Sequence, residues 1–543
     1  MMKIMGASVG NCVHVGGIVN FLKLAEKHGY QTSFLGPATS VSRVVEEFER
    51  SKPDIVALSY RLTPETAKKI LLEVKEAKLG GKFGKARLIF GGTPAVSKVA
   101  TELGIFDWIV TGSELPADLD AWLSGQVVAQ PPESFPSTLV ERIGKSSPFP
   151  IVRHHFGQPA LKATIEGAKK IAEARVLDVL SIAPDQNAQE YFFHTELMKP
   201  ELDGAGGVPV RKPEHLKAIS DAAKCGNFPL LRCYSGTNEL TKWAVMLKET
   251  VNIAWGAVPL FWYSQLDGRS TRPVDVAIKE NMEAVAWYAS EGIPVEINES
   301  HHWSLRNAHD TVAVAAAFLA TFNAKHHGVK TYVAQLMFNN PPGTSPAMDL
   351  AKMFAKLELI ESLQDKEFRI IREARSGLTS LPLDENAAKG HLGSSIHTMM
   401  AVKPHIVHVV GYSEAAYAAT PDIIIESCKI AGGAIRNALI GVPNPLADPE
   451  VISRKDHLVK EAKFLLATIK EHYGPISPSP WSDPRTLAQA VKSGILDAPH
   501  LIGNPVARGE TVTKMVNGAC EAINPKTGEV ISEAERLRLL GIA

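Results

Sequence analysis

The sequence lacks three things: a long apolar run, an excess of charge of either sign, and paired cysteines. No apolar stretch approaches the roughly 20 residues that a membrane-spanning helix needs. The 58 basic residues are balanced by 58 acidic ones, which argues against nucleic acid or an anionic membrane surface as the main partner. The five cysteines form no C-x-x-C motif and are expected to be free thiols in a reducing compartment.

The chain enters a strand-like run without the apolar core of a signal peptide, so we expect a cytoplasmic protein. At 543 residues, 45% of them hydrophobic, it is too long for one ordinary core. We therefore expect a sheet domain at 1–125, a proline-rich linker at 126–150 and a large catalytic domain at 151–445. A small C-terminal α+β region at 446–543 is expected to pack on the catalytic domain.

Within residues 1–125, short apolar runs alternate with segments of helical periodicity. Strands are expected at 3–9, 32–35, 54–60, 87–90 and 108–110, and helices at 17–28, 41–50, 64–78, 94–103 and 114–123. Five such β/α repeats predict a doubly wound, flavodoxin-like parallel sheet. Ligands of such sheets bind at the carboxyl ends of the strands.

The distinctive residues of this domain fall at those strand ends. They are Cys12, His14, Gly16 and Gly17 after the first strand, Ser59 and Leu62 at the third, and Gly91 and Gly92 after the fourth. Glycine pairs allow the backbone to approach a ligand closely. The sequence contains neither G-x-G-x-x-G after the first strand nor a P-loop, so an ordinary nucleotide site is a poor fit.

These motifs resemble the cobalamin-binding domain shared by adenosylcobalamin-dependent mutases and methionine synthase. That family has Asp-x-His-x-x-Gly, then a Ser-x-Leu segment, then Gly-Gly. His14 and Gly17 match the first motif, Ser59 matches the second, and Gly91-Gly92 matches the third. The resemblance implies adenosylcobalamin as cofactor, with His14 displacing the cofactor's own base and ligating the cobalt.

Two departures from the family pattern concern the same site. Cys12 stands where the family has the aspartate that holds the other ring nitrogen of the histidine. Leu62 comes one place later than the family's leucine, because Arg61 occupies that position. A cysteine is a weaker hydrogen-bond acceptor than a carboxylate, so the departure at Cys12 concerns the electronic tuning of His14 more than its ligation.

Residues 151–445 again alternate between strand-like and helical runs. Strands are expected at 176–182, 230–234, 257–263, 293–297, 330–336, 368–372 and 405–410. About eight β/α units over this length predict a (β/α)8 TIM barrel, whose site lies at the C-terminal ends of its strands. Polar residues gather at several of those ends.

The segment 225–440 and the tail at 490–499 resemble the large subunit of glutamate mutase (methylaspartate mutase). In that family three arginines grip the substrate carboxylates, and a lysine and a glutamate lie near the cofactor ribose. Arg232 matches one arginine, Glu414 matches the glutamate, and Val410 stands at the lysine position. The other two arginines have no clear counterpart. Because a guanidinium is the natural grip for a carboxylate, their loss argues against glutamate as the substrate.

Simpler interpretations apply to the same residues. Arg232 could form a salt bridge inside the barrel, and Glu414 could be a carboxylate at a helix N-terminus. The His301-His302 pair invites a metal site, but adjacent residues of a strand point to opposite sides. No Gly-x-Ser-x-Gly elbow supports a hydrolase.

The two resemblances together imply an adenosylcobalamin-dependent isomerase, a carbon-skeleton mutase of a small carboxylate or related substrate, working as a homodimer. A corrinoid-dependent methyltransferase is the main alternative. Its cobalamin domain usually follows a helical cap, whereas this chain begins directly at the first strand. A non-catalytic corrinoid-binding protein is a third hypothesis, against which the large barrel argues. An aminomutase with pyridoxal phosphate is a fourth, although no lysine is signalled for it.

Overall fold

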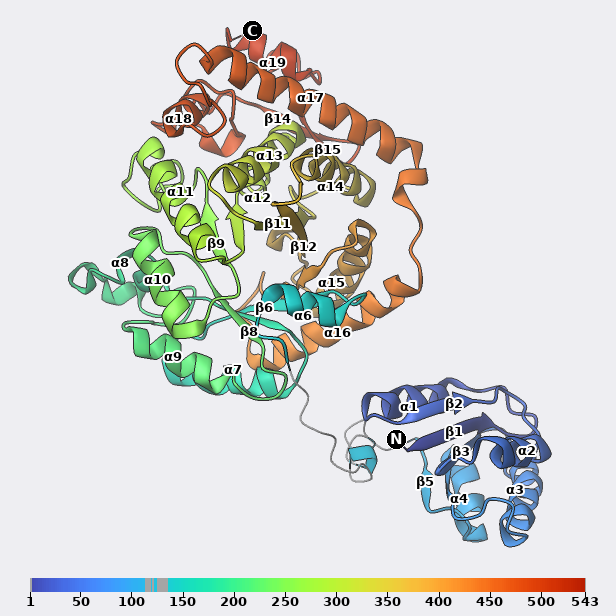
Figure 1. Ribbon diagram of the computed structural model, residues 1–543. Coiled ribbons are helices and arrows are strands. Elements are labelled where there is room, and N and C mark those ends of the chain that lie inside the picture. The colour runs from blue at the N-terminus through green and yellow to red at the C-terminus, as the bar shows by residue number, and fades with distance from the viewer. Residues whose placement is uncertain (1, 113–118, 120–121, 125–134, 543) are drawn as a thin grey trace. The chain divides into compact units, whose positions relative to one another are not determined.

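The computed structural model describes residues 2–112, 119, 122–124 and 135–542. The chain forms two compact units, residues 1–134 and 135–543 (Figure 1). Each unit has its own sheet and its own hydrophobic core. None of the helices in the described part of the chain combines the length and hydrophobicity of a membrane span.

The N-terminal unit is a five-stranded parallel sheet in the order β2-β1-β3-β4-β5. Its strands are β1 (Lys3–Ser8), β2 (Gln31–Phe34), β3 (Ile55–Tyr60), β4 (Arg87–Gly92) and β5 (Trp108–Val110). Its helices are α1 (Gly16–Lys27), α2 (Val41–Ser51), α3 (Pro64–Leu79) and α4 (Pro94–Leu103). These elements confirm the predicted doubly wound fold. The helix predicted at 114–123 lies largely outside the described residues.

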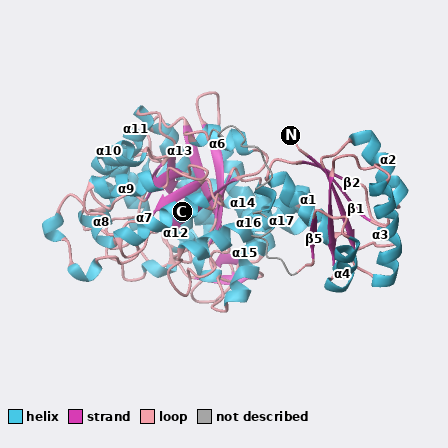
Figure 2. Cartoon of the chain, turned by 90° about the horizontal axis from the view of Figure 1, so that it is seen from below, coloured by secondary structure: helices cyan, strands magenta, loops and turns pink. Residues whose placement is uncertain are grey.

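Helices cover both faces of this sheet (Figure 2). One face is packed by α2, α3 and α4, whose buried side chains form one cluster with those of β1, β3 and β4. The other face is packed by α1 together with Leu123, which is buried. Since both faces are covered, a ligand can reach the sheet only at its edges or at the ends of its strands.

The second unit contains an eight-stranded parallel sheet that closes into a near-barrel. Its strands are β6 (Ile151–Phe156), β7 (Val179–Ile182), β8 (Leu230–Cys233), β9 (Gly256–Pro259), β10 (Val295–Asn298), β11 (Thr331–Phe338), β12 (Arg369–Ser376) and β13 (Ile406–His408). Successive strands are neighbours, and β13 pairs with β6. Strands β8 and β9 are not paired, but just before β9 the Ala254 N–H donates to the Leu231 carbonyl at 2.8 Å. This arrangement confirms the predicted TIM barrel.

One barrel strand, β6, was not among the predicted strands. Its sequence Ile-Val-Arg-His-His-Phe carries three polar residues in a row, which hides its apolar alternation. Arg153 and His154 are nevertheless fully buried. Charged residues inside a short strand are rare in a core unless the fold pairs them, and here the barrel supplies the partners across its interior.

Eight long helices follow the strands around the outside of the barrel (Figure 1). They are α7 (Leu161–Glu173), α9 (Pro213–Ala222), α10 (Leu240–Val251), α11 (Val274–Ser290), α13 (Asp310–His326), α14 (Pro346–Glu361), α15 (Glu385–Met399) and α16 (Pro421–Ile440). The loops also carry two short helices, α8 (Gln186–Tyr191) and α12 (Ser300–Ser304).

The predicted linker at 126–150 is partly structured. Helix α6 (Leu139–Ser146) lies within that range and belongs to the second unit. Leu139 is buried with Ile151, Val179 and Ile406, which are the first residues of β6, β7 and β13. Helix α6 therefore closes the N-terminal end of the barrel. The sequence 126–150 lacks clear periodicity because α6 is only two turns long and one of its buried residues is Arg142.

The C-terminal region is joined to the barrel through one continuous core. It consists of α17 (Pro449–Tyr473), α18 (Pro484–Lys492), the hairpin of β14 (Thr513–Val516) and β15 (Ala519–Ala522), and α19 (Glu533–Leu539). Helix α17 packs along α13 and α14. Its buried face, which includes Leu458, Leu465 and Ile469, contributes to the same core as the barrel helices.

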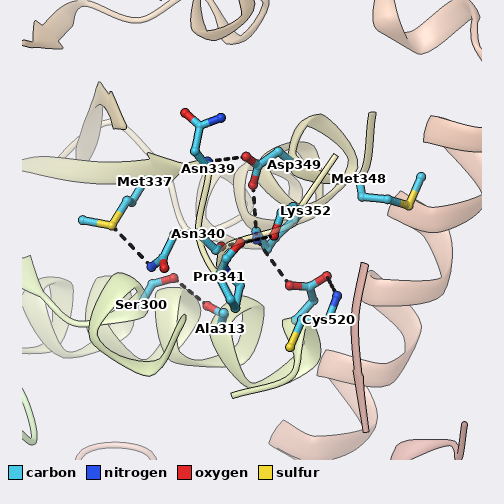
Figure 3. A network of polar contacts seen from close by, with 12 residues as sticks. Ser300, Ala313, Met337, Asn339, Asn340, Pro341, Met348, Asp349, Lys352 and Cys520 are labelled. Atoms are coloured by element: carbon cyan, nitrogen blue, oxygen red, sulfur yellow. Dashed lines mark hydrogen bonds and ion pairs between the residues drawn. The ribbon is translucent and has the colours of Figure 1, made fainter. Parts of the chain in front are cut away.

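A buried ionic network also ties this region to the barrel (Figure 3). Lys352 Nζ lies 3.3 Å from Asp310 Oδ1 and 3.2 Å from Asp349 Oδ1, and it donates to the Asn340 carbonyl at 2.7 Å. Asp310 Oδ2 lies 3.0 Å from Arg454 Nη2 on α17 and accepts from the Cys520 N–H at 3.3 Å. All the side chains of this network are buried, so each charge depends on its partners.

We predict that Lys352→Met destabilises the second unit by about 3–5 kcal/mol, because it leaves Asp349 buried without its cation. Urea unfolding followed by tryptophan fluorescence measures the change. Lys366→Met is the control, since Lys366 is exposed and its loss should shift the free energy of unfolding by less than about 0.5 kcal/mol. Equal stabilities of the two variants would show that the network contributes nothing.

Candidate cofactor site and barrel interior

The loop between β1 and α1 presents His14 at the carboxyl end of the sheet. The loop is held by its own backbone: the Cys12 N–H donates to the Val9 carbonyl at 3.2 Å, and the Cys12 carbonyl accepts from Ser8 Oγ and the Ala38 N–H, each at 2.9 Å. Cys12 is fully buried, whereas His14, two residues later, is exposed. The loop therefore fixes the backbone while leaving the imidazole accessible to a ligand.

Cys12 lies beneath this histidine. Its Sγ is 3.9 Å from His14 Nδ1, which is a long sulfur contact of the kind a thiol makes with a ring nitrogen. A contact at Nδ1 orients the ring and leaves Nε2 as the nitrogen that could bind a metal ion. Cys12 therefore contacts His14 through sulfur, at the position where the cobalamin-domain pattern has a carboxylate.

A cavity of about 560 Å³ opens beside His14 at the ends of β3 and β4. Five of the eight predicted cofactor residues line it, namely His14, Gly17, Ser59, Gly91 and Gly92. The other three do not line it. Cys12 is in the core beneath the loop, and Gly16 and Leu62 are outside the lining. Further lining comes from residues without a motif, among them Phe21, Tyr60, Arg61, Thr93 and Leu119.

The lining suits a large, mostly apolar organic group. A side-chain carbon built at Gly17 or Gly91 would meet no atom within 4 Å, so these glycines leave space that a ligand can fill. At Gly92 the same carbon would lie 2.8 Å from the Tyr60 carbonyl oxygen, so glycine is required there by the sheet itself. Ser59 Oγ is buried and has no hydrogen-bond partner among the described residues. A buried hydroxyl without a partner is unfavourable unless a ligand supplies one.

Cobalamin fits this arrangement. If His14 bound the cobalt, an organic part of the cofactor would lie beside this histidine and would need an enclosed site. The cavity provides such a site, with Ser59 as a hydrogen-bond donor and Gly17 and Gly91 giving close access to the backbone.

Comparison with known proteins agrees with this fit. Residues 2–117 match the family model of the B12 binding domain, so the N-terminal unit is a B12-binding domain. A solved structure described as a novel cobalamin-binding protein from Desulfitobacterium hafniense DCB-2 is 26% identical, with a TM-score of 0.19. The match covers 22% of this chain and 55% of that one, so this chain spans about half the length of that relative.

A second solved structure, of the cobalamin-dependent S-adenosylmethionine radical enzyme OxsB, is 10% identical over 90% of this chain and 71% of that one, with a TM-score of 0.17. TM-scores this low establish no shared overall fold. No curated protein sequence matches the chain. The family match therefore defines the N-terminal unit, and the role of the barrel depends on its own residues.

The barrel interior contains a buried layer of four charged residues. Arg153 on β6 pairs with Glu373 on β12 and lies 3.5 Å from Glu296 on β10. Arg232 on β8 pairs with the same Glu296 at 2.9 Å. Arg153 and Arg232 hold the pKa of Glu296 below its ordinary value although burial opposes this, whereas burial raises the pKa of Glu373.

Arg232, the predicted substrate arginine, therefore forms a salt bridge with Glu296 inside the barrel. Its guanidinium also lies 5.5 Å from the ring centre of Tyr234 and 5.6 Å from that of Trp255. Two of its donors, Nε and Nη1, have no partner among the described residues. Burial disfavours its charge, but Glu296 and Glu373 hold the pKa of Arg232 above its ordinary value, so it stays a cation.

Glu414, the predicted ribose-side glutamate, follows β13. Its Oε1 accepts from the Gly411 N–H at 2.9 Å and lies 3.3 Å from His154 Nε2, while the side chain is 24% exposed. It stabilises the turn after the strand and still has an accessible face. It belongs to no described α-helix, so the helix-terminus interpretation does not apply.

Sequence reasoning missed most of the interior residues, namely Arg153, His155, Glu296, Glu373 and His408. The sequence marks these residues only weakly. Each is a polar residue within a strand, on the face that points toward the barrel axis. His155 Nε2 lies within hydrogen-bond distance of Tyr234 Oη at 2.8 Å and of Arg153 Nη2 at 3.2 Å. Burial, followed by the charge of Arg153, holds the pKa of His155 well below its ordinary value, so this ring is neutral.

The His301-His302 pair lies in the short helix α12, not at the end of an extended strand as the sequence analysis assumed. The rings lie 4.5 Å apart between centres. Burial lowers the pKa of both rings well below the ordinary histidine value. Among the described residues no group of three or more potential metal ligands occurs, and the lowered pKa values make both rings neutral at pH 7.

We predict that Gly91→Leu abolishes cobalamin binding, because the new side chain extends into the cavity. Gly91→Ala should reduce affinity far less, since a methyl group meets no neighbour. Binding is measured by titrating the purified chain with hydroxocobalamin and following the absorption spectrum. Circular dichroism should be unchanged in both variants. Normal affinity in Gly91→Leu would show that the cofactor does not use this cavity.

Proposed function

We propose that the chain is an adenosylcobalamin-dependent isomerase, a carbon-skeleton mutase resembling glutamate mutase that acts on a small carboxylate other than glutamate. The observation that carries this proposal is the combination in one chain of two features. One is a B12-binding domain with His14 beside a 560 Å³ cavity, and the other is an eight-stranded barrel with a charged interior. A non-catalytic carrier would need no such barrel.

When bound, adenosylcobalamin supplies radical chemistry through its weak cobalt–carbon bond. Residues of the N-terminal unit would bind the cofactor. His14 Nε2 is available to ligate the metal, and Ser59 Oγ can donate a hydrogen bond to the cofactor. Gly17 and Gly91 leave space in which the cofactor can approach the backbone. The near-closed ring of barrel strands would shield reactive carbon centres from water and oxygen.

The substrate proposal is supported by the residues of the barrel. Arg232 is already paired with Glu296, which leaves it less able to grip a substrate carboxylate. The other two arginines of the glutamate mutase pattern have no clear counterpart, and the nearby segments after β6 and β7 read Gly157-Gln158-Pro159-Ala160 and Asp185-Gln186-Asn187. Asp185 is fully buried and pairs with Arg211. The barrel therefore lacks the arginines that would bind both carboxylates of glutamate.

Two cofactor forms separate the alternatives. The full chain is loaded with adenosylcobalamin or methylcobalamin, and small carboxylic acids, amides and amino acids are added while cobalt(II) is monitored by electron paramagnetic resonance. The mutase proposal predicts a signal with the adenosyl form only. Loss of the methyl group to a thiol or a pterin would establish a methyltransferase. Tight binding without either reaction would establish a carrier.

We predict that His14→Ala weakens adenosylcobalamin binding by about tenfold or more, since a metal–ligand bond is lost and no neighbouring side chain replaces it. The absorption spectrum of any bound cofactor should lose the features of histidine ligation. Val13→Ala is the matched control, because Val13 lies in the same loop and is 63% exposed. If His14→Ala kept both the affinity and the spectrum, His14 would not be the ligand.

A further inference from the structure

Strand β12 places a third arginine, Arg375, above the charged layer of the barrel. Side chains alternate along a strand, so Ile371, Glu373 and Arg375 point to the same face. Ile371 packs in the cluster at the N-terminal end of the barrel, and Glu373 meets Arg153 in the middle layer. Arg375 is thus the next residue toward the C-terminal opening, which is where TIM barrels bind their substrates.

Arg375 differs from the other two barrel arginines in having no carboxylate of its own. Arg153 and Arg232 share Glu296 and Glu373. No acidic side chain among the described residues forms a salt bridge with Arg375. Its one described hydrogen bond runs from Nε to the carbonyl of the adjacent Ser376 at 3.3 Å, which leaves both Nη groups available. The side chain is half-buried.

The groups on which Arg375 acts electrostatically include four neutral rings and the carboxylate of Glu373. Burial is the largest cause that lowers the pKa of His155, His301 and His408 far below the ordinary value, and the charge of Arg375 adds to it at each ring. Burial raises the pKa of Tyr234, against the effect of Arg375. At neutral pH these four side chains are uncharged, and the nearby Glu373 is already bound to Arg153.

The surroundings therefore combine one unpaired guanidinium with neutral imidazole and phenol groups. A cation that is half-buried without a counter-ion is costly, and a bound anion removes that cost. A guanidinium with two free Nη groups matches the two oxygens of a carboxylate. One arginine can bind one carboxylate. The neutral side chains can donate hydrogen bonds to the rest of a small molecule or accept hydrogen bonds from it.

We propose that Arg375 binds the carboxylate of the substrate at the C-terminal opening of the barrel, and that the substrate carries a single carboxylate there. Calling the bound anion a substrate rests on the proposed function, whereas the anion site itself does not depend on the cofactor. Arg375 was not singled out from the sequence, because its lack of a partner is visible only when the neighbouring strands are in place.

The test uses the full chain without cobalamin and sodium acetate as the probe, with acetamide as the uncharged analogue. Saturation-transfer-difference nuclear magnetic resonance measures binding of each. Wild type should bind acetate and not acetamide, and Arg375→Gln should weaken acetate binding by about tenfold or more. Arg375→Lys should retain part of it. Arg369→Gln is the control, because Arg369 lies on the same strand and is exposed.

Equal acetate binding by wild type and Arg375→Gln, or no binding by wild type, would overturn the inference. Equal binding of acetate and acetamide would do so too, since the site would not recognise charge. Cobalamin binding is measured in a separate titration of each variant and should be normal in Arg375→Gln. A chain that binds acetate through Arg375 but shows no adenosyl-dependent reaction would contradict the proposed function and leave the anion site standing.

Discussion

The contact on which the cofactor site depends is that between Cys12 Sγ and His14 Nδ1. A histidine in an exposed loop has many orientations, and holding any one of them costs conformational entropy. Here the backbone around Cys12 is fixed by three hydrogen bonds, and the buried sulfur lies against one ring nitrogen. The other nitrogen is then the free one, beside a cavity whose glycines and unpartnered Ser59 hydroxyl suit a large organic group.

A corresponding constraint governs the barrel, where buried charges have to be paired. Arg153 and Arg232 form salt bridges with Glu296 and Glu373. These contacts hold the four side chains of the middle layer in fixed positions. Such a layer contributes little net stability, because desolvation offsets the attraction between its charges. Its value is positional: it lies between the apolar cluster at the N-terminal end of the barrel and Arg375, the next residue on the same face of β12.

Much of the fold could be predicted from the sequence, because both units alternate apolar strands with amphipathic helices. The motif residues around His14 could be predicted too, since a loop, a serine and a glycine pair lie at the carboxyl ends of β1, β3 and β4, which are neighbours in one sheet. Strand β6 could not, because Arg153, His154 and His155 mask its apolar pattern. The role of Arg232 was open for a related reason. Whether an arginine is paired depends on Glu296, 64 residues away on another strand.

Electron paramagnetic resonance of cobalt(II) cobalamin bound to the chain, with histidine labelled by nitrogen-15, tests the central claim most directly. If His14 ligates the cobalt, each cobalt line splits into three with ordinary nitrogen and into two with the label, and His14→Ala loses the splitting. Lines that keep three components with the label would mean that the cofactor's own base remains the ligand. That result would contradict the assignment of His14.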